Sequence, residues 1–528
     1  MNIEQVQRSK KSVAKVMGVH KGFNYKEPYK QTDEVEFGGT AFFVDPSIFG
    51  DQFPMNVESK RFALTNFHVV DELYKKKCFL CYPEKGKSQI SASVIYNVPE
   101  LDVAVLMVDP DGEHPLWFDG EPIADFISKI PNLPINETPI KGNSQNVVAI
   151  GFPNLSNDYQ LCEGCISGRG HSMIQLSISL NGGNSGGPLM MNGSVIGICT
   201  ASIYGSEALG LAVPILQTIR FFKYWTDFSN IILRTPIWGV KTRTTTVDYL
   251  DYFNINRNMK GCSIQKHIPN GATELAKLAE NDIILNIHSD DKTYVVDNFG
   301  LVSVDWTDKR VKFDNLEFIL SLDPGAITFD VFQWKTKKVK NSIEVNPFPI
   351  DFEVRDLHHC WEEINYCVLG GMVFMNLSKN HLEYEEDEEE DEEDEEVPIN
   401  ETLPLTQFSN KTMNLKSSVI VTHIPAQTHV SACGQLRAFD RILKCNGDDV
   451  TNVIQFEEMI KHAVKKYNKQ ACDRDNFIVI ETNKDTVYLR LETLKTREVH
   501  DAIEDNYPSS KCHLLKMKQK RKRRRNPN

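Results

Sequence analysis

The stretch Asn181-Gly-Gly-Asn-Ser185-Gly-Gly-Pro-Leu189 places a serine inside a glycine-rich turn. It is followed by Asn192-Gly193, which separates the apolar runs Leu189–Met191 and Val195–Cys199 in the manner of a two-residue hairpin. Similar short apolar runs, separated by Gly, Pro, Asn and Asp, extend from about residue 35 to 215. Many short strands with little helical periodicity predict a β-barrel or β-sandwich assembly.

The remainder of the chain has a different pattern. Beyond an expected helix at Ile215–Phe228, strands alternate with helical stretches in residues 232–345 and again, more loosely, in 415–495. The two regions are interpreted as divergent copies of one α+β module. The runs expected to be strands before residue 215 include Phe37–Val44, Arg61–Phe67, Ser91–Tyr96, Val103–Val108, Val147–Phe152, Met173–Leu180 and Val195–Thr200.

Charge is concentrated in two short segments of the 528-residue chain. The formal net charge is −13, but residues 383–396 alone carry thirteen carboxylates, so the rest of the chain sums to zero. Such a run repels itself, and we expect it to be disordered. Lys516–Arg525 contains eight bases within ten residues. This distribution argues against a uniformly acidic protein and against one that coats nucleic acid.

The cysteines and apolar segments bear on compartment and metals. Twelve cysteines are scattered over the chain, which indicates a reducing compartment. The pairs Cys78/Cys81 and Cys162/Cys165 have zinc-like spacing, but both fall on expected strands, where residues three apart point to opposite faces. We therefore expect no metal and no cofactor. The first twenty residues lack the apolar core of a secretory signal, and no window reaches the ~18 apolar residues of a membrane span.

Three segments carry the chemistry of a nucleophilic serine. His68 follows the run beginning at Ala63, Asp102 precedes the apolar run Val103–Val108, and Ser185 occupies the glycine-rich turn. A serine hydroxyl needs a general base, and a histidine oriented by an aspartate supplies one. The turn also lets the N–H groups of Gly183 and Ser185 converge on a developing oxyanion.

These motifs resemble the trypsin-like proteases of the HtrA/Deg family. The matching segments are Thr65-Asn-Phe-His68-Val-Val, Asp102–Leu106, Gly183–Leu189, Gly38-Gly-Thr-Ala-Phe-Phe, Ala149-Ile-Gly-Phe-Pro and Gly210-Leu-Ala-Val-Pro-Ile. The resemblance covers roughly residues 35–500. Asn365–Leu377 resembles a bridging segment of the eukaryotic, plant-type Deg branch that has nuclear members.

The resemblance implies a mainly β chain with a trypsin-like double β-barrel and two α+β PDZ-like modules. The boundaries it suggests are an N-terminal extension (1–30), the protease domain (31–230), PDZ-like domain 1 (232–345), a bridging segment (346–382), the acidic insert (383–400), a degenerate PDZ-like domain 2 (401–500) and a basic tail (501–528).

Peptide binding is expected in the first PDZ-like module only. Ile237, Trp238, Gly239 and Val240 lie where the family's carboxylate-binding loop falls. The second module shows no comparable loop and has Phe439 where the family has glycine, so we expect it to serve assembly or docking. Asn281 takes the corresponding glycine position in the first module.

The resulting hypothesis is an ATP-independent serine endopeptidase that cleaves unfolded or regulatory proteins through an acyl-enzyme. The alternative is a non-proteolytic chaperone or PDZ scaffold on the same fold. The residues before Ser185 include no carboxylate to pair with Lys or Arg, and the resemblance implies cleavage after small or medium aliphatic residues. Expected partners are protein or peptide substrates, further copies of the chain, and a nuclear import receptor that reads the basic tail. We expect a nuclear (or nucleolar) location, with the cytoplasm as the alternative, and no membrane or nucleic-acid partner.

Overall fold

The chain divides into two compact units, Met1–Lys21 with Glu34–Ile350 and Gly22–Asp33 with Asp351–Asn528. The computed structural model describes residues 9–30, 32–53, 60–82, 89–112, 117–118, 121–140, 142, 144–170, 173–202, 210–225, 227–305, 307, 309–322, 325–382, 405, 407–409, 411–425, 430–431, 434–467 and 476–496. The acidic insert at 383–400 and the basic tail at 501–528 therefore lie outside the described residues.

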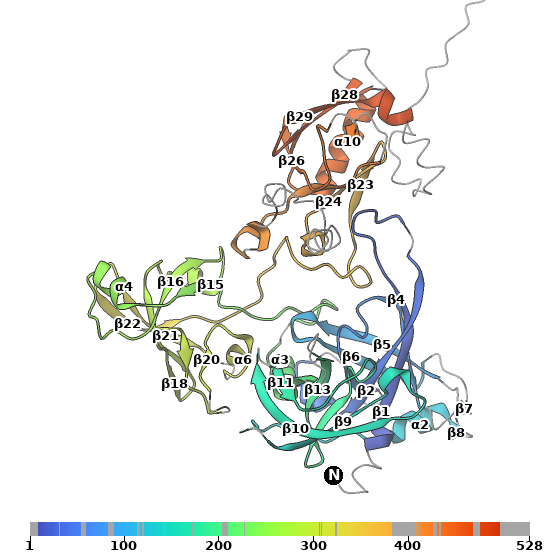
Figure 1. Cartoon of the computed structure of the whole chain (residues 1–528), viewed down its shortest axis with the longest axis vertical. Helices are drawn as coiled ribbons and strands as arrows, with labels where there is room; N and C mark the ends of the chain where they lie inside the picture. Colours follow the sequence, from blue (N-terminus) through green and yellow to red (C-terminus); the bar gives the residue numbers. More distant parts are fainter. Residues whose placement is uncertain are drawn as a thin grey trace, which may run out of the picture. The chain divides into compact units, whose positions relative to one another are not determined.

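The first unit begins with two closed six-stranded barrels (Figure 1). Barrel 1 has the strand order β1-β2-β3-β6-β5-β4, and barrel 2 has the order β10-β11-β14-β13-β12-β9. The strands of barrel 1 are β1 (Val13–Lys21), β2 (Glu34–Val44), β3 (Arg61–Thr65), β4 (Leu73–Cys81), β5 (Gln89–Val98) and β6 (Val103–Val108). Those of barrel 2 are β9 (Asn146–Gly151), β10 (Gln160–Gly170), β11 (Met173–Leu176), β12 (Pro188–Met191), β13 (Ser194–Ser202) and β14 (Gly210–Pro214).

One apolar core joins the two barrels. Phe42 and Phe62 of barrel 1 belong to the same buried cluster as Ile150 and Ile198 of barrel 2. Helix α3 (Ile215–Tyr224) follows barrel 2 directly and adds Phe221 and further side chains to this cluster. Because strand ends of both barrels meet along this shared core, loops from each barrel can contribute to one site.

An α+β module follows α3 in the same unit. Its sheet has the order β15-β16-β17-β21-β22, with β18 paired to β17. Asn281 has φ +71°, so asparagine does occupy a left-handed position just before β17. The elements are β15 (Val240–Arg243), α4 (Val247–Tyr252), β16 (Cys262–His267), α5 (Ala272–Leu275), β17 (Ile283–Ser289), β18 (Lys292–Val295), β19 (Leu301–Val302), β20 (Val311–Lys312), α6 (Leu316–Ile319), β21 (Thr328–Gln333) and β22 (Lys338–Glu344).

The second unit is built on a sheet of order β23-β24-β25-β26-β28-β29, packed against helix α10 (Val453–Tyr467). Its strands are β23 (Tyr366–Leu369), β24 (Met372–Asn376), β25 (Val419–His423), β26 (Arg441–Cys445), β27 (Asp448–Asp449), β28 (Phe477–Thr482) and β29 (Thr486–Arg490). Phe439 adopts φ +66°, the left-handed conformation that a glycine accepts at lower cost.

The β1–β2 connection, residues 22–33, belongs to this second unit. Tyr25 is buried there, and its hydroxyl donates to the carbonyl of Leu357 at 2.6 Å. The carbonyl of Tyr25 lies 3.2 Å from Nε2 of the buried His381. The hydroxyl of Thr422 donates to the carbonyl of Lys26 at 2.8 Å. Segment 22–33 is therefore an integral part of the second unit's packing.

The sequence prediction of a double barrel followed by two α+β modules is confirmed, but two boundaries differ. Val13–Lys21, expected to be part of an N-terminal extension, is the first strand of barrel 1 and pairs with β2 along its whole length. Tyr366–Asn376, expected to be part of a bridge, forms the β23–β24 hairpin of the second unit's sheet. In both cases the paired strands are separated by a long or low-complexity connection, and local sequence patterns do not reveal such pairings.

In the described part of the chain, no helix is both long enough and apolar enough to span a membrane.

Candidate active site

His68 and Asp102 are brought together at the ends of neighbouring strands of barrel 1. Nδ1 of His68 lies 2.9 Å from Oδ2 and 3.0 Å from Oδ1 of Asp102. The backbone N–H of His68 also donates to Oδ1 at 3.0 Å. The carboxylate therefore fixes both the ring and its main chain. A proton on Nδ1, which this contact favours, leaves the lone pair of Nε2 available as a base.

The position of Asp102 depends on a short turn before β6. The 3₁₀ turn Pro99–Leu101 ends at Asp102, which adopts the left-handed conformation (φ +53°, ψ +48°). Aspartate tolerates this conformation better than most residues with a side chain. The backbone carbonyl of Asp102 accepts a hydrogen bond from Nδ2 of Asn66 at 2.9 Å. The turn thus directs the carboxylate toward His68 while its main chain is held by the histidine's own loop.

Ser185 lies in the turn that precedes β12. Its Oγ donates to the backbone carbonyl of Thr200 at 3.2 Å. Within the described residues its hydroxyl makes no hydrogen bond to His68. Thr200 also reaches the acid, because its Oγ1 donates to Oδ2 of Asp102 at 2.5 Å. Thr200 therefore contacts both Asp102 and Ser185, and Asp102 in turn contacts His68.

The peptide units around Ser185 are held by hydrogen bonds on their outer side. The carbonyl of Gly182 accepts from the N–H of Asn154 at 2.6 Å, and that of Asn184 accepts from the N–H of Gly187 at 3.0 Å. In a trans peptide the N–H points away from the carbonyl. The N–H groups of Gly183 and Ser185 therefore point away from these anchors, and neither has a hydrogen-bond partner in the described part of the chain.

Gly183 cannot be replaced by another residue without displacing backbone. It has φ +96°, and a Cβ built on it would lie 2.2 Å from the carbonyl oxygen of Phe152. The thiol of Cys199, close to the turn, is buried, which raises its pKa to about 12. That thiol stays protonated at neutral pH, so Ser185 is the nucleophile candidate of this turn.

Sequence reasoning missed three buried residues that organise the site: Thr40, Asn66 and Thr200. Oδ1 of Asn66 accepts from the N–H of Gly186 at 2.6 Å, while its Nδ2 binds Asp102. The sequence shows that Asn66 lies two positions before His68 and that Thr200 ends an apolar run. It does not show the hydrogen bonds that these side chains make to Asp102 and Gly186, 36 to 120 residues away.

The expected peptide-binding loop in the first α+β module is only partly available. The N–H of Ile237 donates to the carbonyl of Phe348 at 3.1 Å, so it is already used. The indole of Trp238 is buried and donates to the carbonyl of Phe313 at 2.9 Å. Val240 begins the edge strand β15. Among the described residues, the N–H groups of Trp238 and Gly239 have no hydrogen-bond partner, and both residues are buried.

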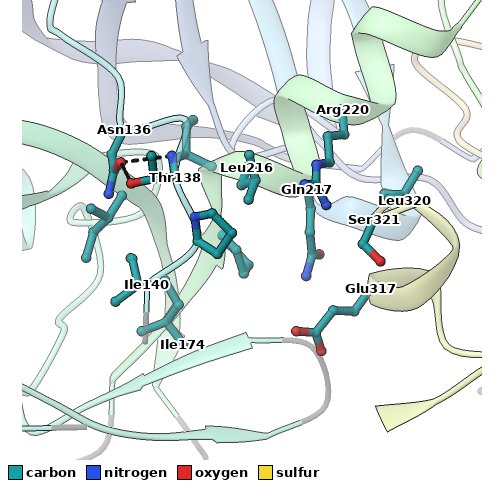
Figure 2. A pocket seen from close by; sticks show the side chains of 14 residues that line it. Asn136, Thr138, Ile140, Ile174, Leu216, Gln217, Arg220, Glu317, Leu320 and Ser321 are labelled. Carbon is teal, nitrogen blue, oxygen red and sulfur yellow. Dashed lines mark hydrogen bonds between the residues drawn. The ribbon is translucent and has the colours of Figure 1, made fainter. Parts of the chain in front are cut away.

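A pocket that does not include His68, Asp102 or Ser185 lies between barrel 2, α3 and the segment around α6. Figure 2 shows Gln217 and Arg220 of α3 facing Glu317 and Ser321 on one side of the pocket, with Ile140 and Ile174 on the other. Its cavity of about 40 Å³ holds little more than one water molecule. None of His68, Asp102 and Ser185 lines it, so this pocket is not the place where a substrate would meet these residues.

The cysteine pairs lie where the sequence predicted, on strands. Cys78 and Cys81 are in β4, and Cys162 and Cys165 are in β10. Cys78 is buried, and burial raises its pKa to about 12, which disfavours the thiolate that a metal would need.

Comparisons with known proteins agree with this geometry. Residues 39–198 match the model of the trypsin-like peptidase domain, and residues 356–501 match that of the PDZ domain. The latter match places β23 and β24 within the PDZ domain, as the sheet does. The chain therefore contains a trypsin-like peptidase domain followed by a PDZ domain.

Three curated relatives illustrate its similarity to whole proteins. A probable periplasmic serine endoprotease, DegP-like, of Pseudomonas putida is 26% identical over 44% of this chain and 46% of its own length. The periplasmic pH-dependent serine endoprotease DegQ of Escherichia coli is 26% identical over 44% and 48%. The putative protease Do-like 12, mitochondrial, of Arabidopsis thaliana is 22% identical over 70% and 67%. The chain spans about half the length of the two bacterial relatives.

Proposed function

We propose that this chain, a trypsin-like peptidase related to the HtrA/Deg serine proteases, is an ATP-independent serine endopeptidase of proteins and peptides. The observation that carries the proposal is the carboxylate of Asp102, which binds the ring of His68 and the hydroxyl of Thr200 beside Ser185. A histidine oriented by a carboxylate is the general base that acyl transfer by a serine requires, which supports the proposal.

The mechanism follows from these groups. When the Ser185 hydroxyl turns from Thr200 toward His68, Nε2 takes its proton as Oγ attacks the substrate carbonyl. The oxyanion is received by the N–H groups of Gly183 and Ser185. His68 then protonates the leaving amine, and the acyl group remains on Oγ. Water, deprotonated by His68, attacks the ester and returns the serine. Asp102 stabilises the imidazolium in both halves.

Casein cleavage by the full-length chain tests this function. Substituting Ser185→Ala should abolish cleavage and change the unfolding temperature little, because only the hydroxyl and its single long hydrogen bond of 3.2 Å are removed. Equal cleavage by the Ser185→Ala variant, purified free of host proteases, contradicts the proposal.

The serine's contact with Thr200 favours a second candidate, a non-proteolytic chaperone on the same fold. In that case the hydroxyl stays on the Thr200 carbonyl and the site never forms an acyl-enzyme. A chaperone suppresses aggregation of a denatured client equally well with Ser185 or with Ser185→Ala, and it never cleaves the client.

Within the proposed function, PDZ-like domain 1 receives a peptide C-terminus at the N–H groups of Trp238 and Gly239, which have no hydrogen-bond partner among the described residues. The second PDZ domain serves assembly of a homo-oligomer. Light scattering should therefore report a particle several times the 60.1 kDa of one chain. A monomer at micromolar concentration contradicts the assembly proposal.

We propose that the chain belongs to the nuclear branch of the Deg proteases and is located in the nucleus. The basic tail, Lys516–Arg525, supports this proposal as a binding site for an import receptor. Residues 511–528 fused to a fluorescent protein should concentrate it in nuclei. Deleting them should leave the protease in the cytoplasm, and nuclear accumulation of the truncated protease contradicts the role of the tail.

A further inference from the structure

Thr40 lies in the middle of β2 and is completely buried. Its backbone N–H donates to the carbonyl of Ser185 at 2.8 Å. Its hydroxyl donates to the carbonyl of Gly183 at 2.7 Å and accepts from the N–H of Phe152 at 3.2 Å. Its own carbonyl accepts from the hydroxyl of Thr65 at 2.8 Å. One residue of barrel 1 therefore binds the serine turn of barrel 2 at two points.

These two points lie on either side of the second oxyanion donor. The N–H groups of Gly183 and Ser185 belong to peptide units that are joined by the Gly183–Asn184 peptide. The Thr40 hydroxyl holds the carbonyl of that joining peptide, so it constrains the angle between the two donors. The Thr40 N–H holds the carbonyl of Ser185, two residues further along the chain.

The turn needs such a constraint because it is rich in glycine. Gly183 has no Cβ, so rotating the peptide on either side of it costs little in local sterics. A rotated Gly183–Asn184 peptide would change the direction of the Gly183 N–H relative to the Ser185 N–H. Donors that stabilise a developing oxyanion must already be aimed at it before reaction.

We propose that Thr40 is a positioning residue of the proteolytic reaction, whose side-chain hydroxyl fixes the oxyanion-binding turn for catalysis. It touches no substrate and acts through the Gly183 carbonyl. This inference rests on the proposed endopeptidase function. The hydroxyl orients the turn, whereas the rest of the side chain only fills space between the barrels.

Three variants of the full-length chain test this difference between the hydroxyl and the rest of the side chain. Thr40→Val keeps the shape and removes the hydroxyl, while Thr40→Ser keeps the hydroxyl and removes the methyl group. Thr218→Val is the matched control, because Thr218 in α3 is equally buried and its hydroxyl has no partner within the described residues. Ser185→Ala is included to check the proposed function itself. The measurements are kcat and KM for fluorescein-labelled casein and the unfolding temperature of each variant.

Loss of one direct oxyanion donor costs about 10²–10³ in kcat, so loss of a group that orients the donors should cost about 10–100-fold. We expect this fall in kcat for Thr40→Val with KM within about threefold, and near-normal kcat for Thr40→Ser and Thr218→Val. A merely structural hydroxyl would leave kcat of the folded fraction unchanged.

Each other outcome overturns the proposal. If Thr40→Val has the same kcat as Thr218→Val, the hydroxyl does not position the turn. The same conclusion follows if Thr40→Ser loses as much kcat as Thr40→Val. If Thr40→Val does not fold, Thr40→Ala replaces it, because alanine lacks both γ-methyl groups of valine. Failure of both to fold, with Thr40→Ser folded, assigns the hydroxyl to stability instead. Persistent cleavage by Ser185→Ala identifies failure of the proposed function rather than of the role of Thr40.

Discussion

Oγ1 of Thr200 donates a hydrogen bond of 2.5 Å to Oδ2 of Asp102, the same oxygen that lies 2.9 Å from Nδ1 of His68. The backbone carbonyl of Thr200 accepts from Oγ of Ser185 at 3.2 Å. One residue near the end of β13 therefore contacts both the acid and the nucleophile. The position of this strand in barrel 2 determines how the acid from barrel 1 faces the serine.

Replacing Thr200 with valine should lower kcat about 10- to 100-fold, because a hydrogen bond to a charged group contributes about 1.5–3 kcal/mol. Thr200→Ser retains the hydroxyl and should recover most of the activity. Casein cleavage by the two purified variants provides the comparison. Equal activity of Thr200→Val and Thr200→Ser would show that the contact with Asp102 is dispensable.

Asn66 links the loop of Asp102 to the turn of Ser185, so its loss should affect both stability and rate. Asn66→Ala removes the partner of the Asp102 carbonyl, while the N–H of Gly186 keeps only its second bond, to the carbonyl of Cys199 at 2.9 Å. A polar group left unsatisfied costs about 1–3 kcal/mol. We expect a lower unfolding temperature together with a lower kcat.

Asn97→Ala is the matched control for this effect. Asn97 is equally buried, and neither its side-chain oxygen nor its nitrogen has a partner in the described part of the chain. Differential scanning fluorimetry and casein cleavage should separate the two variants. If Asn97→Ala lowers kcat as much as Asn66→Ala does, the hydrogen bonds of Asn66 have no special role in catalysis.

The sequence was most informative where chemistry is encoded in neighbouring residues. The turn around Ser185 could be recognised because Gly183 must adopt a positive φ against the Phe152 carbonyl. Asn192-Gly193 correctly indicated the β12–β13 hairpin. Thr40 and Thr200 could not be recognised as site residues, since their hydroxyls acquire partners only when the two barrels close on each other.

The strands that were missed have physical reasons of the same kind. β1 carries Lys15 and Lys21 among its apolar residues, and its pairing with β2 follows a connection that packs in the other unit. β23 and β24 form a recognisable hairpin at Gly370 and Gly371, both with positive φ. Their sheet partner β25 lies beyond the acidic run, so the hairpin was interpreted as a bridge.

His381 should make the packing of segment 22–33 sensitive to acid. Its Nδ1 accepts from the N–H of Ser378 at 3.0 Å, which leaves Nε2–H to donate to the carbonyl of Tyr25 at 3.2 Å. Burial lowers the pKa of His381 to about 4, because the buried site disfavours the charged imidazolium. A shift of this size corresponds to roughly 3 kcal/mol.

The sign follows from proton binding. Between pH 6.5 and 4 the unfolded chain binds more protons at this position, so stability is fully present above pH 6.5 and falls as the pH drops toward 4. In a Ser185→Ala background, hydrogen exchange of residues 22–30 should accelerate over this range relative to β16 of the same molecule. His381→Gln should remove most of that dependence. An unchanged dependence in His381→Gln would assign it to other groups.

The central claim is that Ser185 is a nucleophile activated by His68, and covalent labelling tests it most directly. The full-length chain is incubated with a fluorophosphonate, and the modified peptide is identified by mass spectrometry. We predict one phosphonyl group on Oγ of Ser185, formed rapidly by the unsubstituted chain, much more slowly by His68→Ala, and not at all by Ser185→Ala. An unlabelled Ser185 in a folded chain, or equal labelling of His68→Ala, would contradict it.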